Sequence, residues 1–277
     1  MHEAERGETV RTIARAGDPD RALSALFAPR DARAGLFALY AFNVELARIA
    51  EQTSEPDLGA IKLQWWRDAV AKATSGEVTG HPVADAFGDA MRRHALPPER
   101  VAALIDARLF DIAEKIMPNL PSLEAYLRDT AGNLFALAAA ILGARDGAIE
   151  PASNATGVAY GLTGLMRALP VHAASGRVYL PADTLRRHGT APEHVLAGET
   201  SQGLRDALAE LRTAARGAHQ EAAGHIAKLA ATARTAFLPL SLVDPYLTAL
   251  DKSGRDPLRE IAEINPLYRL WRLARFR

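Results

Sequence analysis

Apolar side chains recur every three or four residues along most of the chain, which is the period of helices that bury one face. This spacing predicts helices over residues 31–53, 58–74, 81–94, 101–116, 122–142, 154–169 and 204–229. Glycines and prolines separate these segments, as they do at helix ends. In the second helix, the positions expected to face the core are Leu58, Ile61, Trp65 and Ala69.

The regular spacing breaks between Val171 and Thr200. Residues 176–181 are typical of an ordered loop, and we expect a short helix and a turn at Gly189 after it. No glycine- and serine-rich linker, internal repeat or low-complexity tract divides the chain. We therefore expect residues 1–277 to form one helical domain.

The amino-acid composition favours the same all-α fold class. Alanine is abundant, whereas the β-branched and aromatic residues that favour strands are sparse. Apolar residues make up 48% of the chain, which is enough for a sizeable core. The 33 basic side chains balance 33 acidic ones, so there is no net positive charge to attract nucleic acid, and we expect no such partner. The lack of cysteine excludes thiol catalysis and cysteine-based zinc sites.

The first eight residues mix acids with bases and contain no apolar run. This pattern fits neither a secretory signal nor a transit peptide. No apolar stretch approaches the roughly 20 residues that a transmembrane helix needs. We therefore expect a cytoplasmic location in a bacterium, with peripheral attachment to the inner membrane as a further option.

Single residues of catalytic or metal-binding types do not identify a functional site on their own. Asp106 and Asp111 lie on one predicted helix, but a separation of five residues turns them about 140° apart, so they cannot chelate one ion together. We expect both to face solvent. The eight histidines show no metal-binding spacing. Gly157 and Gly161 are four residues apart, which favours close packing of two helices in the core.

Several short strings follow one another in the order seen in a known enzyme family. They are FAPRDAR at 27–33 with ALYAF at 38–42, HPVA at 81–84 with LID at 104–106, YLRDTAG at 126–132, GVAYGLT at 157–163 and GRVYLP at 176–181. These five ordered matches resemble the squalene/phytoene synthase family and are far more specific than one short motif. The resemblance covers roughly residues 15–235. It implies a single-domain, all-α isoprenoid-synthase fold with helices around a deep prenyl pocket.

Enzymes of this family join two prenyl diphosphates, and two aspartate-rich segments hold Mg²⁺ against the diphosphates. Ionising an allylic diphosphate leaves a polyanion that metal ions and basic side chains have to stabilise. The first family motif reads Asp-Asp-x-x-Asp. At the corresponding positions this chain has Ala47, Arg48 and Glu51, so two carboxylates are replaced, one of them by a cation.

The second motif is degenerate as well. The family pattern Asn-x-x-Arg-Asp-x-x-Glu-Asp corresponds to residues 164–172, which keep its arginine as Arg167. The acids of the pattern are replaced by Ala168, Val171 and His172. Because Mg²⁺ needs oxygen ligands, we expect no metal site, no cofactor and no catalytic residue at these degenerate positions.

One alternative keeps an enzymatic activity. If Glu45, Glu51 and Asp111 came together in the folded chain, they would form an atypical Mg²⁺ site. The protein would then be a prenyl transferase that condenses two farnesyl or two geranylgeranyl diphosphates. The resemblance to the family alone does not exclude this activity.

A second set of strings resembles one subgroup of the family. These strings are AFNVELA at 41–47, QWWR at 64–67, MRALPVH at 166–172 and LYRLW at 267–271. The subgroup comprises proteins similar to the mitochondrial complex I assembly factor that is related to phytoene synthase. The resemblance implies a non-catalytic protein whose partner is a complex I subunit or another protein client. A lipid carrier without such a client is a third option.

Some polar residues of the family pocket are retained. Positions to which the resemblance assigns contact with a substrate or prenyl lipid are Arg33, Tyr40, Arg167, Arg177 and Tyr179. Arginine binds phosphate without a metal, so a retained site could hold a lipid without converting it. The other interpretation is that these residues now form internal salt bridges, and we favour it slightly.

Residues 265–277 form a basic, amphipathic carboxyl-terminal segment. Its side chains predicted to contact an anionic membrane surface or a protein partner are Arg269, Trp271, Arg272 and Arg275. In the alternative interpretation, the helical spacing of the apolar positions closes the core while the arginines face water. The apolar positions concerned are Leu267, Leu270, Trp271 and Ala274.

Overall fold

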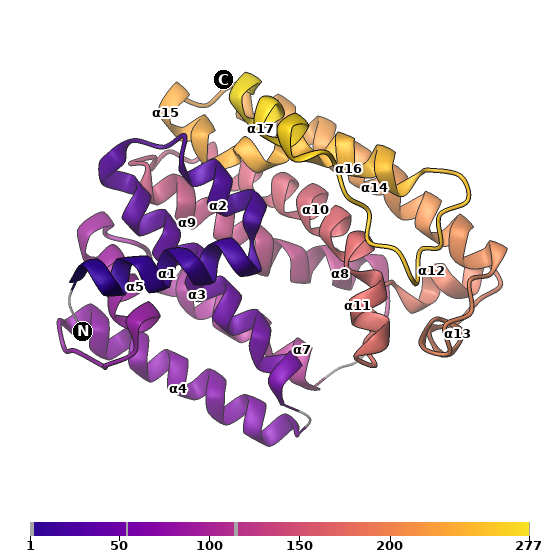
Figure 1. Cartoon of the computed structure of the whole chain (residues 1–277), viewed down its shortest axis with the longest axis horizontal. Coiled ribbons are helices and arrows are strands. Elements are labelled where there is room, and N and C mark those ends of the chain that lie inside the picture. Colours follow the sequence, from indigo (N-terminus) through magenta and orange to yellow (C-terminus); the bar gives the residue numbers. More distant parts are fainter. Residues whose placement is uncertain (1–2, 54, 114–115, 277) are drawn as a thin grey trace.

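The computed structural model describes residues 3–53, 55–113 and 116–276 and is built of helices (Figure 1). The first half contains α1 (Glu3–Gly17), α2 (Pro19–Ala25), α3 (Arg30–Gln52), α4 (Pro56–Ser75), α5 (Pro82–His94), α6 (Pro98–Ala107) and α7 (Leu109–Ala113). Next come α8 (Leu120–Leu127), the π-helix η1 (Arg128–Gly132), α9 (Asn133–Ile141), α10 (Ile149–Arg167), α11 (Leu169–Ala174), α12 (Ala182–Arg187) and α13 (Pro192–Leu196). The chain ends with α14 (Gln202–Ile226), α15 (Ala231–Arg234), the 3₁₀-helix η2 (Thr235–Leu242), α16 (Val243–Leu250) and α17 (Pro266–Arg275). The described residues contain no strand, so the predicted all-α class is confirmed.

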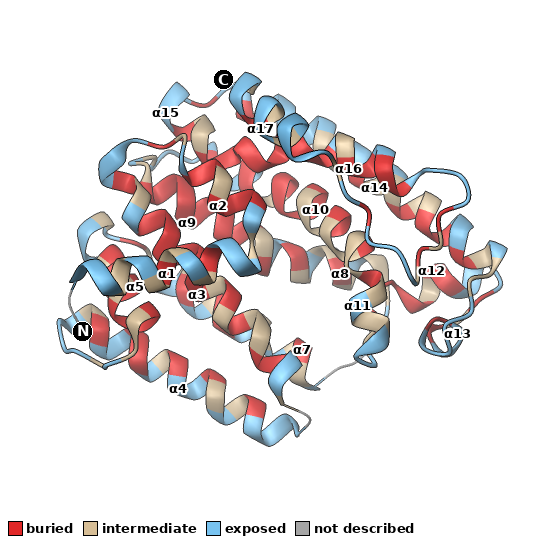
Figure 2. Ribbon diagram, viewed as in Figure 1, coloured by how far each residue is buried: buried red, intermediate tan, exposed pale blue. Residues whose placement is uncertain are grey.

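The core lies along the helices in the middle of the molecule, where Figure 2 shows most of the buried residues. Every residue of α9 is buried, and α3 buries every residue from Gly35 to Phe42. Among the described helices, α10 and α14 pack against each other most extensively. One continuous hydrophobic cluster includes side chains from α1 through α16. The same core therefore supports both halves of the chain.

The crossing of α10 over η1 depends on glycine. A Cβ atom on Gly157 would lie 2.5 Å from the backbone nitrogen of Gly132, and one on Gly161 would lie 2.5 Å from a methyl carbon of Leu127. Distances this short exclude any larger residue without a shift of the backbone or of the packed side chain. The prediction of close helix packing at these two glycines is confirmed.

The predicted helices 31–53, 58–74, 81–94 and 204–229 correspond to α3, α4, α5 and α14. The prediction of one helix over 101–116 is wrong. The chain turns at Arg108 between α6 and α7, where the guanidinium of Arg108 is held inside by Asn43 and Asp111. Ile116 instead forms an isolated parallel bridge with Val178.

Several boundaries also differ from the sequence prediction. α8 starts at Leu120, because the side chain of Asn119 accepts a hydrogen bond from the Ser122 amide. α10 starts at Ile149, five residues before the predicted start. The hydrophobic spacing does not predict α1, because that helix buries only Val10 and Ala14.

The predicted inward face of α4 is wrong at three of its four positions. Leu58, Ile61 and Trp65 are 46%, 65% and 45% exposed, and Ala69 alone is buried. The buried face instead carries Gly59, Leu63, Trp66, Ala69, Val70 and Ala73. α4 has apolar residues on both faces, so its hydrophobic spacing does not distinguish them. Gly59 has no side chain, which lets Ile112 pack closely against α4. This contact favours the observed face as the inner one.

Residues 251–265 form a long connection without regular structure, which we call the C-terminal strap. It runs out toward α12 and returns across α10 to α17 (Figure 1). Asp256 accepts a hydrogen bond from Thr200, and the carbonyl of Ala262 accepts one from Arg167. The strap therefore fastens the last helix to the end of α10.

The outer side of α17 is exposed (Figure 2). It carries apolar side chains, which contradicts the prediction that these side chains close the core. Leu267, Leu270 and Trp271 are 77%, 44% and 47% exposed. The inner side holds the buried Leu273 together with Arg269 and Arg272. No helix of the described part of the chain is both long enough and apolar enough to cross a membrane.

Candidate functional site

A cavity of about 180 Å³ lies between α3, α8, α10 and α11. We call it the central cavity. It is lined by Arg21, Asn43, Arg108, Tyr126, Leu127, Thr130, Ala131, Leu134, Tyr160, Gly161, Gly164, Leu165 and His172. Its volume lies below the roughly 300–1,000 Å³ of ordinary small-molecule sites. It is therefore too small, as it stands, for two prenyl diphosphates.

One wall of the central cavity is held by a buried carboxylate. Asp111 is 4% exposed, and its Oδ1 accepts hydrogen bonds of 2.8 Å from the hydroxyls of both Tyr126 and Tyr179. Its Oδ2 accepts a hydrogen bond of 3.1 Å from Arg108, which also donates to the side-chain oxygen of Asn43 at 2.9 Å. We call Asp111, Arg108, Tyr126 and Tyr179 the Asp111 cluster.

Both oxygens of the Asp111 carboxylate accept hydrogen bonds within the Asp111 cluster. Burial raises the pKa of Tyr126 and Tyr179, so both remain protonated donors at neutral pH. Burial alone would lower the pKa of Arg108, but Tyr126 and Asp111 offset it, and that guanidinium stays charged. The prediction that Asp111 faces solvent is therefore wrong. Asp106 is exposed as predicted and pairs with Arg67.

His172 lies beside the Asp111 cluster, with its ring 4.8 Å from the ring of Tyr179. Burial lowers the pKa of His172 to about 4, although Asp111 favours the protonated form. The residue that stands where the family has an acid is therefore a neutral imidazole at physiological pH. His172 and Arg108 both line the central cavity. A neutral imidazole supplies no negative charge there to hold the metal ions of a metal-diphosphate complex.

Replacing His172 with phenylalanine is expected to reduce the loss of stability in acid. Between pH 6.5 and 4 the unfolded chain binds a proton on His172 that the folded chain does not bind, so stability falls as the pH drops through this window. The difference amounts to about 3 kcal/mol at pH 4. Urea unfolding of both proteins at pH 7 and pH 4 measures it. Equal losses in the two proteins would show that His172 is accessible to protons in the folded state.

The degenerate first motif ends α3. Arg48 pairs with Glu45 at 3.6 Å, Glu51 is exposed, and Ala50 accepts a hydrogen bond from Arg177 through its carbonyl. Across the described residues, no three histidine, aspartate or glutamate side chains are close enough to hold a metal ion. The structure therefore does not gather Glu45, Glu51 and Asp111 as the enzymatic alternative requires. The residues present do not fit Mg²⁺.

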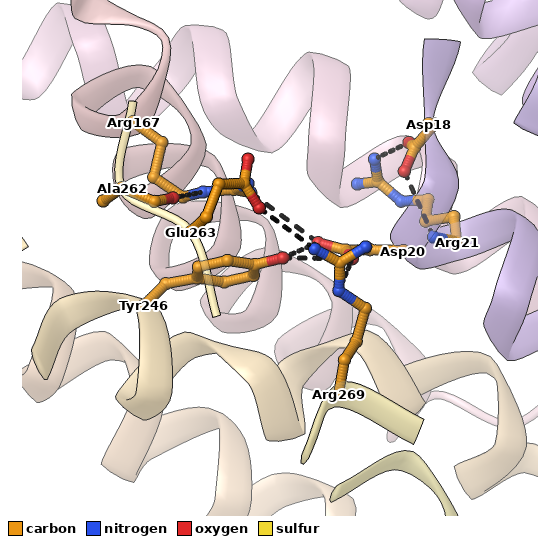
Figure 3. Close-up of polar contacts among 8 residues, drawn as sticks. All are labelled: Asp18, Asp20, Arg21, Arg167, Tyr246, Ala262, Glu263 and Arg269. Carbon is orange, nitrogen blue, oxygen red and sulfur yellow. Dashed lines mark hydrogen bonds and ion pairs between the residues drawn. The ribbon is translucent and has the colours of Figure 1, made fainter. Parts of the chain in front are cut away.

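A second buried acid lies beside the carboxyl-terminal end of α10, in a group that we call the Asp20 cluster (Figure 3). Asp20 accepts hydrogen bonds of 2.9 and 3.1 Å from the hydroxyl of Tyr246. Its carboxylate lies 3.1 Å from the guanidinium of Arg269 and 3.6 Å from that of Arg167. Both arginines also pair with Glu263 of the C-terminal strap, at 3.1 and 3.2 Å.

The two arginines of the Asp20 cluster are paired with acids of the same chain. Arg167 stacks over the ring of Tyr246 at 3.6 Å and donates to the carbonyl of Ala262. Burial raises the pKa of Asp20, whereas Arg269 and Arg167 favour its charged form. The retained motif arginine is thus paired with Asp20 and Glu263 within the chain. For Arg167 this agrees with the interpretation of internal salt bridges.

Arg21 is a buried cation on the wall of the central cavity. It donates a hydrogen bond of 2.7 Å to Asp18, and its guanidinium lies 4.4 Å from the ring centre of Tyr160. Burial lowers the pKa of Arg21, but Asp18 more than offsets this effect, and the group stays charged. Its Nε and Nη2 atoms find no hydrogen-bond partner among the residues described.

The predicted pocket residues do not form one site. Tyr179 lies in the Asp111 cluster, Arg177 donates to Ala50 near that cluster, and Arg167 lies in the Asp20 cluster. Tyr40 is buried in the core, and Arg33 donates to the carbonyl of Ala28 on the far side of α3. Whether any of them binds a lipid remains a prediction.

The residues that hold the site together include several that the sequence does not single out. These are Asp20, Arg21, Arg108, Tyr126, Tyr246 and Glu263. Each is charged or aromatic in a helix or loop where such residues usually face water. A local signal exists only near Asp20, because Asp18 and Pro19 are typical of a helix start.

The predicted membrane or partner contacts of α17 fall on two sides of the helix. Arg269 is held by Asp20, and Arg272 donates a hydrogen bond of 3.0 Å to the carbonyl of Ser241. Trp271 and Arg275 are exposed, with the guanidinium of Arg275 5.0 Å from the indole ring. Only these two of the four are placed to meet an external surface. Arg277 lies outside the described residues.

The sequence matches the family model of squalene/phytoene synthase over residues 14–272. It is 31% identical to the complex I assembly factor 6 of Bos taurus, named for NADH dehydrogenase (ubiquinone) complex I, over 88% of this chain and 73% of that protein.

Two solved structures have the same fold. A squalene synthase, HpnC, from Alicyclobacillus acidocaldarius superposes with a TM-score of 0.78 at 22% identity, over 92% of this chain and 95% of the other. A dehydrosqualene synthase in complex with ligand superposes with a TM-score of 0.82 at 17% identity, over 99% and 95% of the two chains. At these identities the superpositions establish the shared helical architecture.

Proposed function

Because the chain belongs to the squalene/phytoene synthase family but keeps only one acid, Glu51, of its two aspartate-rich motifs, we propose that it is a non-catalytic member that assists the assembly of respiratory complex I. The observation that carries the first half of this proposal is the state of the motif positions. Ala47, Arg48 and His172 offer no carboxylate, and Arg167 is neutralised internally. The similarity to complex I assembly factor 6 supports the second half, with a complex I subunit or another protein as the client.

The test of the assembly role is deletion of the gene in the source organism. We expect less assembled complex I in the membranes and slower NADH-driven quinone reduction, both restored by the wild-type gene. A gene encoding Glu51→Gln should restore them equally, because Glu51 is exposed and has no metal to hold. Unchanged complex I abundance after deletion would contradict the assembly role.

We expect no prenyl transfer by the purified protein. Incubation with farnesyl or geranylgeranyl diphosphate and Mg²⁺ should release no diphosphate above the buffer blank, because several kcal/mol of metal stabilisation are missing from the transition state. Isothermal calorimetry with Mg²⁺ and the unreactive thiodiphosphate should show no metal uptake. A C30 or C40 hydrocarbon product would establish the competing function, a prenyl transferase with an atypical metal site.

A prenyl lipid in the central cavity is a second candidate ligand. The specific observation in its favour is Arg21, which lines the cavity and whose buried Nε and Nη2 atoms have no hydrogen-bond partner among the described residues. An oxygen atom on the head of a lipid would satisfy them. A crystal soaked with a prenyl thiodiphosphate tests this idea, and density beside Arg21 that disappears in Arg21→Met would support it.

We also propose that the outer face of α17 attaches the protein peripherally to an anionic membrane surface. Leu267, Leu270 and Trp271 are exposed there beside Arg275, a combination suited to the headgroup region. Replacing Leu267 and Trp271 with glutamate should weaken binding to phosphatidylglycerol vesicles by about tenfold or more. Co-sedimentation measures the binding.

The matched control for α17 is the pair Ile61→Glu and Trp65→Glu on α4, which removes equally exposed apolar side chains elsewhere. This control should bind vesicles like the wild type. If both pairs of substitutions weaken binding equally, the attachment is not specific to α17.

A further inference from the structure

A second concave surface lies away from the central cavity, between α1, the start of α3 and α5. Its volume is about 1460 Å³, and seven arginines line it against two acids, Glu3 and Asp89. We call it the arginine groove. The whole chain has no net charge, so this concentration of cations is a local feature rather than a result of composition.

Some cations of the arginine groove have partners. Arg6 pairs with Asp89 at 2.8 Å, and Arg92 pairs with the same carboxylate. Arg11 pairs with Glu8 at 2.7 Å, on the rim. Asp89, one of the two acids in the lining, is therefore already paired with Arg6 and Arg92.

Three other arginines of the groove form no ion pair in the described structure, although Arg15 adds to the effect of Arg11 in lowering the pKa of the Glu8 carboxyl. Arg15, Arg30 and Arg93 are exposed and make no hydrogen bond or ion pair with any residue that the structure describes. Arg15 only stacks on the ring of Phe37, at 5.9 Å. These three side chains come from α1, α3 and α5, so they converge on the groove from three helices.

The placement of one cation works against local helix stability. Arg30 is the first residue of α3, and Arg33 follows within the next turn. The amino-terminal end of a helix favours acids over bases, because the unpaired amide groups there carry partial positive charge. No contact of Arg30 in the described structure offsets this cost. Residues that break a local rule without structural compensation are typical of functional surfaces.

The dimensions and the lining of the groove define what it can bind. Its volume exceeds the roughly 300–1,000 Å³ of small-molecule pockets, so a segment of a macromolecule fits it better. Its concave shape does not suit a flat bilayer. Exposed side chains of Ala4, Ala34 and Leu26 form an apolar floor over the buried Val10, Phe37 and Ala90, and Leu26 is 43% exposed. An apolar floor favours a peptide over the backbone of a nucleic acid.

We propose that the arginine groove binds an acidic, amphipathic peptide segment of a protein partner. Carboxylates of the peptide pair with Arg15, Arg30 and Arg93, and its apolar side chains cover the floor. The inference rests on the proposed function for the kind of partner, a protein client, and it locates the surface that receives it. The central cavity and α17 have no part in it.

The experiment measures fluorescence anisotropy with the full chain and a fluorescein-labelled amphipathic peptide of about 15 residues, built from glutamate and leucine at helical spacing. We expect saturable binding that weakens steeply with salt. In the variant Arg15→Glu, Arg30→Glu and Arg93→Glu, binding should weaken at least about tenfold. The variant should fold normally, because these side chains make no hydrogen bond or ion pair in the described structure, and its circular dichroism and melting temperature check this.

The matched control replaces three exposed cations outside the groove by Arg186→Glu, Lys228→Glu and Lys252→Glu, which changes the net charge by the same amount. It should bind the peptide within about twofold of the wild type, apart from the long-range effect of charge. Equal weakening in both variants would overturn the inference. So would equal binding of a peptide with glutamine for glutamate, or tighter binding of inorganic phosphate, an oligonucleotide or phosphatidylglycerol vesicles.

The groove variant also separates this inference from the proposed function in cells. If the deletion lowers complex I and the groove variant fails to restore it, both are supported. If the groove variant restores complex I fully, the groove inference fails while the assembly role stands. If the deletion has no effect, the assembly role fails, and the peptide measurement alone decides the groove.

Discussion

Replacing Asp111 with alanine is expected to lower the free energy of unfolding by roughly 3–5 kcal/mol. The substitution removes the carboxylate bonded to the largely buried Arg108 and leaves the hydroxyls of Tyr126 and Tyr179 without their acceptor. An unpaired charge and two unsatisfied donors then remain inside the protein, and each costs more than its lost bond. Urea unfolding at pH 7 measures the loss.

The control for Asp111 lies one short helix earlier. Asp106→Ala removes an exposed carboxylate that pairs with Arg67, and it should cost less than about 1 kcal/mol. If Asp111→Ala were as mild as Asp106→Ala, Arg108 would have to reach solvent in the folded protein. The same result would show that the Asp111 cluster does not hold the wall of the central cavity.

Replacing Asp20 with alanine is expected to cost about 3 kcal/mol and to loosen the C-terminal strap. The substitution leaves Arg167 and Arg269 facing each other, with only the exposed Glu263 to separate their charges, and removes the acceptor of the Tyr246 hydroxyl. Limited trypsin digestion should then cut within residues 252–259 at least about tenfold faster than in the wild type, because local opening costs less free energy. Mass spectrometry of the first fragments locates the cut.

Glu263→Ala is the matched control for Asp20. It removes the other acid that contacts the same two arginines, but Glu263 is largely exposed, and the loss should stay near 0–1 kcal/mol. If both variants open the strap equally, the strap is held by the sum of its charges rather than by the buried carboxylate.

Most of the fold can be predicted from the sequence because hydrophobic spacing is a local property. α3, α5 and α14 follow directly from it, since the apolar residues of each keep a helical period and each has a clear end. The spacing fails for α4, where apolar residues lie on both faces and only the neighbouring Ile112 and α5 select the one that turns inward. It also fails at Arg108, where a tertiary contact breaks a pattern that reads as one helix.

The candidate site is harder to predict because its chemistry is carried by pairs that are distant in sequence. The absence of acids at Ala47, Ala168 and Val171 is visible in the sequence itself. The two buried acids that organise the site are not visible in the sequence. Asp20 meets Arg269 only in the folded chain, and Asp111 meets Tyr179 in the same way. A single carboxylate on a helix is usually solvated, and nothing local marks these two as exceptions.

The Asp20 cluster has a consequence for synthesis of the protein. Asp20 is translated long before Arg269, the cation that pairs with it in the folded chain. Until Arg269 has left the ribosome, the nascent chain carries an aspartate that lacks one of its two arginine partners. A product truncated before residue 269 keeps this defect, and we expect the region around Asp20 to open at a lower cost in free energy than in the longer chain.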